Sequence, residues 1–269
     1  MRINIFRHEM NIRVRSVIIW SLSIATLAIF FFSIFPSFAE DAALSNQLMA
    51  KFPQELKDAF GLGKIDMATI LGFLTLVFVF VQLCLAIQAG NFGFGLVSIE
   101  ETEKTADFLL TRPVSRFQIF TSKLLAAMGS LLITDIIVSL AIFLAITSFK
   151  GERTYDAPTL LLMLLSMPIF QLFFLSVGLL ISLLVKKVHN VTPFSLGLAF
   201  GAYVINAFSG VFGDVKLEYL TPFKHFDPVY IVQNFSFDTR LVLINVVVTV
   251  VSLAISYWLY IRRDIHAVS

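Results

Sequence analysis

Residues able to do acid–base, nucleophilic or metal chemistry are few in this sequence and lie far apart. The four histidines, His8, His189, His225 and His266, include no pair at ligand spacing. The one cysteine, Cys84, excludes an internal disulfide and a cysteine-built zinc site. These residue types therefore give little material for a metal centre or a general base, and we predict no catalytic and no metal site.

The sequence also contains no phosphate-binding loop. The pattern Gly-x-x-x-x-Gly-Lys-[Ser/Thr] does not occur, because the Gly-Lys pair at 63–64 is followed by Ile65. The glycine cluster at 90–95 follows a predicted membrane helix rather than a strand, so it predicts the end of a helix. If ATP drives this protein, a separate polypeptide must bind it.

Asp135 is the one acid or base inside a predicted membrane span. It falls near the bilayer midplane, where a charge costs about 2.5–3.5 kcal/mol on insertion scales. No Lys, Arg or His lies at matching depth, but Gln171 in the fourth predicted span and Asn206 in the fifth are polar candidates. We interpret Asp135 as making an interhelical hydrogen bond that fixes packing, in preference to a role in cargo or proton movement.

The amino-acid composition indicates the class of protein that must position these residues. Of 269 residues, 58% are apolar and 14% are charged, and the mean hydropathy is +0.87. So few charges cannot cover a water-soluble surface, which excludes a soluble enzyme. A net charge of +2 excludes a nucleic-acid binder that depends on phosphate neutralisation. The remaining class is an integral membrane protein.

Six apolar stretches are long enough to cross a bilayer as helices, and none alternates with the period of a barrel strand. They predict one all-α domain, residues 1–269, with spans at 16–35, 68–89, 124–149, 158–185, 191–212 and 241–261. Twelve lysines and arginines lie on the side of both termini and eight lie opposite, which places both termini in the cytoplasm. The N-terminal apolar run exceeds the core of a signal peptide, so we keep it as the first span.

Three segments outside the predicted spans have sequence patterns that predict a structure of their own. Apolar residues at helical spacing before the first span predict an interfacial helix over 3–14. The segment 36–67 predicts an amphipathic helix on the outer face, over about 44–60. The segment 214–238 is too apolar for a solvated loop and is interrupted by Pro222 and Pro228, so it predicts a partly re-entrant hairpin buried in protein.

Two glycines in the fifth predicted span are spaced for close helix packing. Gly197 and Gly201 form a small-x-x-x-small notch, which serves contact within one chain or between two chains.

The segment 100–123, between the second and third predicted spans, predicts a rigid cytoplasmic elbow. Its charged first half has helical periodicity and ends at Pro113. Ser115 and Gln118 then form a capping-box pattern for the next helix. A short helix, a sharp corner and a capped span suit the transmission of force from a docked partner.

The same segment resembles the signature of type-2 permeases of ATP-binding-cassette (ABC) exporters. That signature has an acidic lead, a Thr shortly before an acid, a Leu pair, Pro, Arg and Lys. The matching positions here are Glu100, Glu101, Thr105, Asp107, Leu109, Leu110, Pro113, Arg116 and Lys123. Many members have Gly where this chain has Lys104. Six spans with both termini inside agree with the resemblance.

The resemblance implies a function and partners. It implies a coupling helix within 100–123 that docks on an ABC ATPase subunit present in two copies, which binds ATP and magnesium. It implies a second permease chain, identical or a close paralogue, with a pathway lined mainly by the second and fifth spans. We expect an exporter in a bacterial plasma membrane, and the 29 phenylalanines favour a hydrophobic or amphipathic peptide, drug or lipid as cargo.

Two other functions stand as alternatives. An intramembrane protease is one, since Glu100-Glu101 begins like a protease motif, but Thr105 stands where that motif has Arg. An ATP-independent secondary transporter is the other, although it normally has more intramembrane ion-binding groups and internal repeats.

Overall fold

The computed structural model describes residues 3–40, 51–53, 65–102, 115–185, 188, 190–209 and 217–262. Within these ranges, six helices are long and apolar enough to cross a membrane, which confirms the predicted all-α bundle of six spans. These helices are α1 (Ile3–Glu40), α4 (Ile70–Thr102), α6 (Arg116–Phe149), α7 (Ala157–Leu184), α8 (Val191–Phe208) and α11 (Thr239–Arg262).

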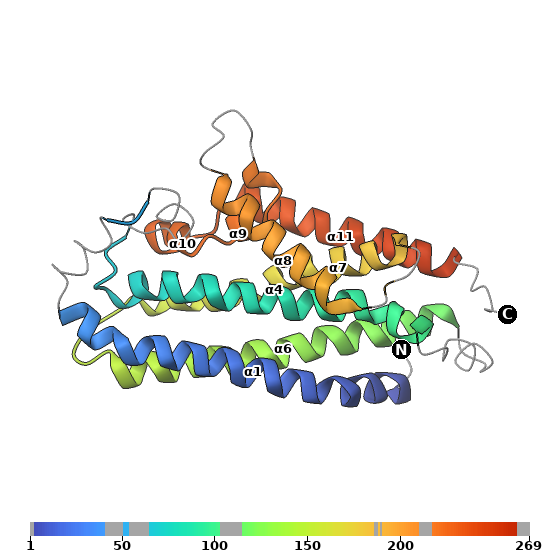
Figure 1. Cartoon of the computed structure of the whole chain (residues 1–269), viewed down its shortest axis with the longest axis horizontal. Coiled ribbons are helices and arrows are strands. Elements are labelled where there is room, and N and C mark those ends of the chain that lie inside the picture. The colour runs from blue at the N-terminus through green and yellow to red at the C-terminus, as the bar shows by residue number, and fades with distance from the viewer. Residues whose placement is uncertain are drawn as a thin grey trace.

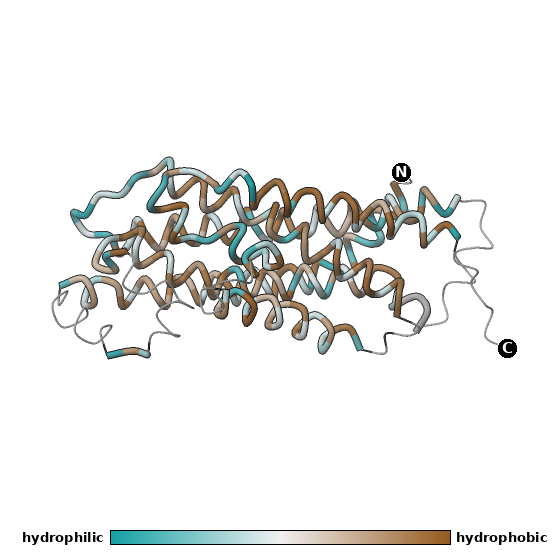
Figure 2. Tube along the Cα trace, turned by 90° about the horizontal axis from the view of Figure 1, so that it is seen from above, coloured by the Kyte–Doolittle hydropathy of each residue, from teal (hydrophilic) through white to brown (hydrophobic). Residues whose placement is uncertain are grey.

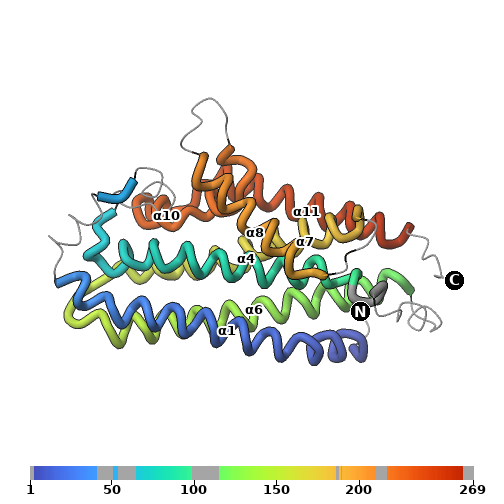
Figure 3. Tube along the Cα trace, viewed as in Figure 1, coloured from blue at the N-terminus to red at the C-terminus, as the bar shows by residue number. Residues whose placement is uncertain are grey.

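The helices run up and down along one long axis, so both ends of the chain lie at the same end of the bundle (Figure 1). We call this the termini end. Helix α1 packs along α6, α4 packs along α7 and α8, and α7 also packs along α11 (Figure 3). Apolar residues dominate the helices over most of their length, and polar residues gather toward the ends (Figure 2). This distribution is the one a bilayer requires of a spanning bundle.

Helix α1 differs from the sequence expectation. Residues 3–14 do not form a separate interfacial helix, because one continuous helix of 38 residues runs from Ile3 to Glu40. Its first turns pack against the rest of the bundle, since Glu9 and Arg13 are buried there. The helix expected over 44–60 lies outside the described residues, apart from 51–53.

Helix α4 also runs further than predicted. The glycine cluster at 90–95 does not end it, because the helix continues to Thr102. A Cβ on Gly93 would come within 2.3 Å of the carbonyl oxygen of Leu175, and one on Gly178 within 3.3 Å of the carbonyl oxygen of Gly90. The glycines therefore bring the backbones of α4 and α7 into direct contact, which is how helices pack closely in lipid.

The starts of α6 and α7 are capped by side chains. The predicted cap at Ser115 is confirmed, since its hydroxyl accepts a hydrogen bond from the backbone N–H of Gln118 at 3.3 Å. Asp156 caps α7 by accepting from the backbone N–H of Thr159 at 2.9 Å and from its hydroxyl at 2.6 Å. These two bonds lower the pKa of the exposed Asp156 carboxyl below its ordinary value.

The connection between α8 and α11 is packed into the bundle at the end opposite the termini. It contains a 3₁₀ turn, η1 (Leu217–Tyr219), and two short helices, α9 (Pro222–His225) and α10 (Pro228–Asn234). Each helix begins at one of the two prolines predicted to interrupt the segment. The side chains of Phe223, Phe226 and Ile231 are buried, so the described part of this connection packs against the spans, and the partly re-entrant hairpin stays a prediction.

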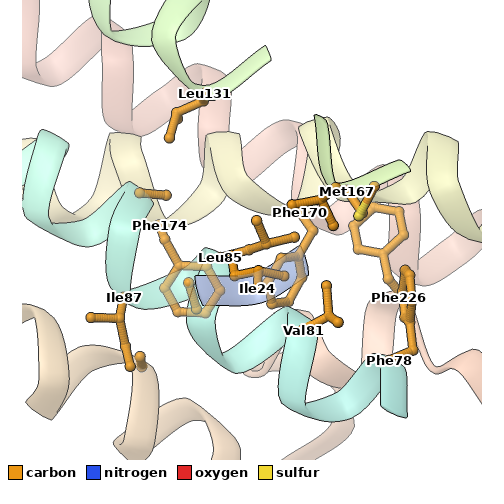
Figure 4. Packing of buried hydrophobic residues seen from close by; sticks show 14 of the residues in the cluster. Ile24, Phe78, Val81, Leu85, Ile87, Leu131, Met167, Phe170, Phe174 and Phe226 are labelled. Carbon is orange, nitrogen blue, oxygen red and sulfur yellow. The ribbon is translucent and has the colours of Figure 1, made fainter. Parts of the chain in front are cut away.

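Aromatic rings hold this connection against α7. Phe170 lies 5.1 Å from Phe223 and 6.4 Å from Phe226, measured between ring centroids in edge-to-face pairs. Figure 4 shows Phe170 and Phe226 within the same apolar cluster as Leu85 and Val81 of α4. The core thus continues from the spans into the α8–α11 connection.

The α4–α7 contact predicts that Gly93 tolerates no side chain. We expect Gly93→Ala to lower the free energy of unfolding by about 1–3 kcal/mol, because the added methyl meets backbone atoms that must move. Gly129→Ala in α6 is the matched control, since among the described residues its Cβ would meet only the flexible side chain of Met10, with Sδ at 3.6 Å and Cε at 4.0 Å. It should change stability by under about 1 kcal/mol, in the stabilising direction. Thermal unfolding of the two purified variants measures the difference, and equal melting temperatures would contradict the contact.

Candidate transport and coupling site

Most of the predicted coupling segment lies outside the described residues. This holds for Thr105, Asp107, Leu109, Leu110 and Pro113. Glu100 and Glu101 lie in the last turn of α4. Arg116 and Lys123 lie in the first turns of α6, so the structure describes both flanks of the segment 103–114.

Arg116 joins the start of α6 to the end of α11. Its Nη1 donates a hydrogen bond of 3.0 Å to the carbonyl oxygen of Ile261, in the last turn of α11. Carbonyls in the last turn of a helix have no intrahelical partner, so an arginine is a favourable donor for them.

Lys123 joins three helices at the termini end. Its Nζ donates a hydrogen bond of 2.9 Å to the carbonyl oxygen of Leu96 in α4 and lies 3.7 Å from Oε1 of Glu9 in α1. The residue is only 4% exposed. A buried lysine needs both partners, because an uncompensated charge at this depth is strongly destabilising.

Glu9 and Arg13 complete this charged cluster. Arg13 Nη1 donates to Oε2 and to the carbonyl oxygen of Glu9, and its guanidinium lies 5.8 Å from the ring centre of Phe92 in α4. Sequence reasoning missed their place in the site, although the i, i+4 spacing of opposite charges is a helix-pairing signal. The cluster fixes α1, α4 and α6 together beside the predicted coupling segment.

Asp135 meets one of its two predicted partners. With the amide nitrogen of Gln171 turned toward it, that nitrogen lies within hydrogen-bond distance of both carboxyl oxygens of Asp135, at 3.3 Å from Oδ1 and 3.1 Å from Oδ2. The Asp135 side chain belongs to α6 and is 5% exposed. Asn206 is not brought to this pair, because it lies in the last turn of α8, a helix that packs on α4.

A second amide contact lies beside the Asp135–Gln171 pair. Gln88 of α4 donates a hydrogen bond of 2.8 Å to the hydroxyl of Thr134, the residue before Asp135. Sequence reasoning missed Gln88, and its signal was an amide side chain within an apolar span. The two contacts link α4, α6 and α7 inside the bundle.

Gly197 and Gly201 face open space within the described part of the chain. A Cβ on either glycine would find no described atom within 4 Å. Large apolar side chains beside them are also exposed, among them Phe194, Phe200 and Val204. The notch is therefore not used for packing within the described chain.

Polar contacts fix the α8–α11 connection to the spans. Gln82 of α4 donates from Nε2 to the carbonyl oxygen of Phe226 at 2.9 Å, and the Thr221 hydroxyl donates to the carbonyl oxygen of Ala202 at 2.7 Å. Buried amide and hydroxyl groups need such partners, so these bonds hold the connection in register with α4 and α8.

His225 is buried where this connection meets α11. Its Nδ1 lies 3.4 Å from Nδ2 of Asn245. Burial lowers the pKa of the His225 imidazole below its ordinary value, although the carbonyls of Tyr219 and Glu218 and the carboxylate of Asp238 partly oppose this. The packed connection therefore favours the neutral ring.

Among the described residues, no three His, Cys, Asp or Glu side chains gather where they could hold a metal ion.

The Asp135–Gln171 contact predicts strong energetic coupling between the two residues. Gln171→Leu leaves the buried carboxyl group of Asp135 without its amide partner and should lower the free energy of unfolding by about 1–3 kcal/mol. In an Asp135→Leu background the same change should cost much less, because no carboxyl group remains. A double-mutant cycle on thermal stability measures the coupling. If the two substitutions prove additive, the side chains do not interact.

The buried His225 predicts that acid loosens the α8–α11 connection. When the connection unpacks, the pKa of His225 returns toward about 6.5, so protons bind the unpacked form more tightly. The stability of the packed form should fall as the pH drops below about 6.5 toward the lowered pKa. Hydrogen–deuterium exchange over residues 217–238, corrected for intrinsic rates, should therefore rise between about pH 7.5 and about pH 5.5. A His225→Asn variant with the same pH response would refute this assignment.

Comparison with known proteins identifies the family of this chain. The family model described as "ABC-2 family transporter protein" matches residues 3–265, which include all six long helices. A search of curated proteins finds no match. The family match confirms the resemblance carried by the segment 100–123, and it extends over the whole bundle. The chain belongs to the ABC-2 family of transporter proteins.

Proposed function

We propose that this chain is the membrane permease subunit of an ATP-driven exporter. The observation that carries the proposal is the family match over residues 3–265, which takes in the whole bundle. The sequence contains no Walker-type phosphate loop, so ATP and magnesium bind a separate ABC ATPase subunit. The chain itself is not an enzyme in this proposal. It forms the route through the membrane.

The ATPase docks at the termini end, through the segment 100–123. Leu109, Leu110 and the corner at Pro113 enter a groove of the ATPase, with Glu100, Glu101 and Arg116 at the rim. Buried apolar anchors dominate such interfaces and rim charges tune them. The contacts of Lys123 with α1 and α4, and of Arg116 with α11, support this proposal, because they tie the start of α6, which follows the segment, to three other helices.

A second permease chain, identical or a close paralogue, packs against the open face of α8. The free notch at Gly197 and Gly201 supports this, since small residues let helix backbones approach closely in lipid. The transporter then contains two permease chains and two ATPase subunits, with a pathway between the permeases bordered by α4 and α8. Lipid covers the remaining apolar surface.

The cargo class and location follow from composition and charge. The phenylalanine-rich spans suit a hydrophobic or amphipathic peptide, drug or lipid. The excess of lysine and arginine at the termini end supports a cytoplasmic position for both termini. We place the complex in the plasma membrane of a bacterium, with transport directed outward.

Docking through Leu110 predicts that a charge there separates the subunits. Leu110→Asp should reduce recovery of the ATPase with the tagged permease by tenfold or more, because each 1.4 kcal/mol of lost affinity is about tenfold. Leu220→Asp is the control, since Leu220 is an exposed leucine in the α8–α11 connection at the opposite end. Co-purification and ATP hydrolysis of both variants test the assignment. Normal ATPase recovery with Leu110→Asp would exclude this segment as the docking site.

A further inference from the structure

Helix α11 has one polar face and one apolar face. Its apolar face is exposed and carries Leu243, Val246, Val247, Val250, Val251 and Ile255. Its buried face carries Asn245, Thr249, Ser252 and Ser256, at intervals of three or four residues. Helix α11 packs mainly along α7 (Figure 1), and the burial of these four residues shows that the polar face is turned into the bundle. The polar groups on the inward face of a membrane span need hydrogen-bond partners inside the protein, because the lipid offers none.

Three of these four side chains have a buried polar atom without such a partner among the described protein atoms. Oδ1 of Asn245, Oγ1 of Thr249 and Oγ of Ser256 are buried without a hydrogen-bond partner in the described part of the chain. The buried serines of α7 behave differently. The hydroxyls of Ser166, Ser176 and Ser182 each donate to the carbonyl oxygen three residues earlier, at 2.6–2.9 Å. Buried atoms without a partner also occur on other helices, such as Oγ of Ser21 and Oε1 of Gln88, but the three atoms of α11 lie in line along one face.

Buried polar atoms without protein partners are usually satisfied by ordered water. We propose that a file of internal water molecules occupies the contact between α7 and α11, from Asn245 to Ser256. This stretch of helix is about 16 Å long at 1.5 Å per residue, so one water molecule cannot serve both ends. Asn245, Thr249, Ser252 and Ser256 supply the side-chain groups that hold the file.

His225 closes the file at the end opposite the termini. Its ring lies against Asn245, and the α8–α11 connection that carries it is packed over the spans. The file gives α11 exchangeable, water-mediated contacts in place of fixed side-chain bonds to α7. This inference does not depend on the identity of the cargo or of the partner subunit.

Water-edited solid-state NMR of the labelled full chain in lipid bilayers tests the proposal directly. Magnetisation from water should reach Thr249, Ser252 and Ser256 several-fold faster than it reaches two control residues. Ser176 is the control for a buried hydroxyl bonded to its own helix, and Val250 is the control for the exposed apolar face of α11. Transfer to Thr249 and Ser256 no faster than to Ser176 would overturn the proposal.

A variant separates a continuous file from isolated water molecules. In the double substitution Thr249→Val and Ser256→Ala, both flanking groups of Ser252 lose their hydroxyls. Transfer from water to Ser252 should then fall toward the level of Ser176. Unchanged transfer to Ser252 in a folded double variant would exclude the file, and the melting temperature of the same sample establishes that the variant is folded.

Discussion

Helices inside a lipid bilayer gain little from burying apolar surface, so this bundle depends on the few places where backbones touch and polar groups pair. The direct contact between α4 and α7 at Gly93 is the central case, because the carbonyl of Leu175 occupies the space that a side chain would need. Helix α4 consequently lies inside the bundle, with α7 and α8 packed along it. The central position of α4 allows it to make polar contacts with several other parts of the bundle.

Three levels of the bundle are tied to α4 by one hydrogen bond each. At the termini end its Leu96 carbonyl accepts from Lys123, and further along the helix Gln88 donates to Thr134. At the opposite end Gln82 donates to the carbonyl of Phe226 in the α8–α11 connection. A displacement of α4 would therefore change the contacts at Lys123, at Thr134 beside Asp135, and at Phe226 in the α8–α11 connection together. This arrangement suits the function proposed above, in which an ATPase docks at one end of the permease and the pathway opens at the other.

Much of this could be predicted from sequence, and the failures have physical causes. Apolar length was sufficient for the six spans, and local chemistry was sufficient for the cap at Ser115. The glycines at 90–95 were misinterpreted as a helix end, because their role depends on the close approach of α7. Depth along a span correctly suggested Gln171 as a partner for Asp135 and failed for Asn206, since depth does not specify which helices are neighbours. The place of Glu9 and Arg13 in the charged cluster could not be predicted, because their burial depends on contacts with other helices.

We propose that this ABC-2 bundle is half of the membrane part of a two-permease, ATPase-driven transporter. Native mass spectrometry of the complex purified through a tag on this chain tests it most directly. We expect one dominant species with the mass of two permease chains, or of this chain and a close paralogue, together with two ATPase subunits. A dominant species that contains a single permease chain, or permease chains without any ATPase, would contradict it.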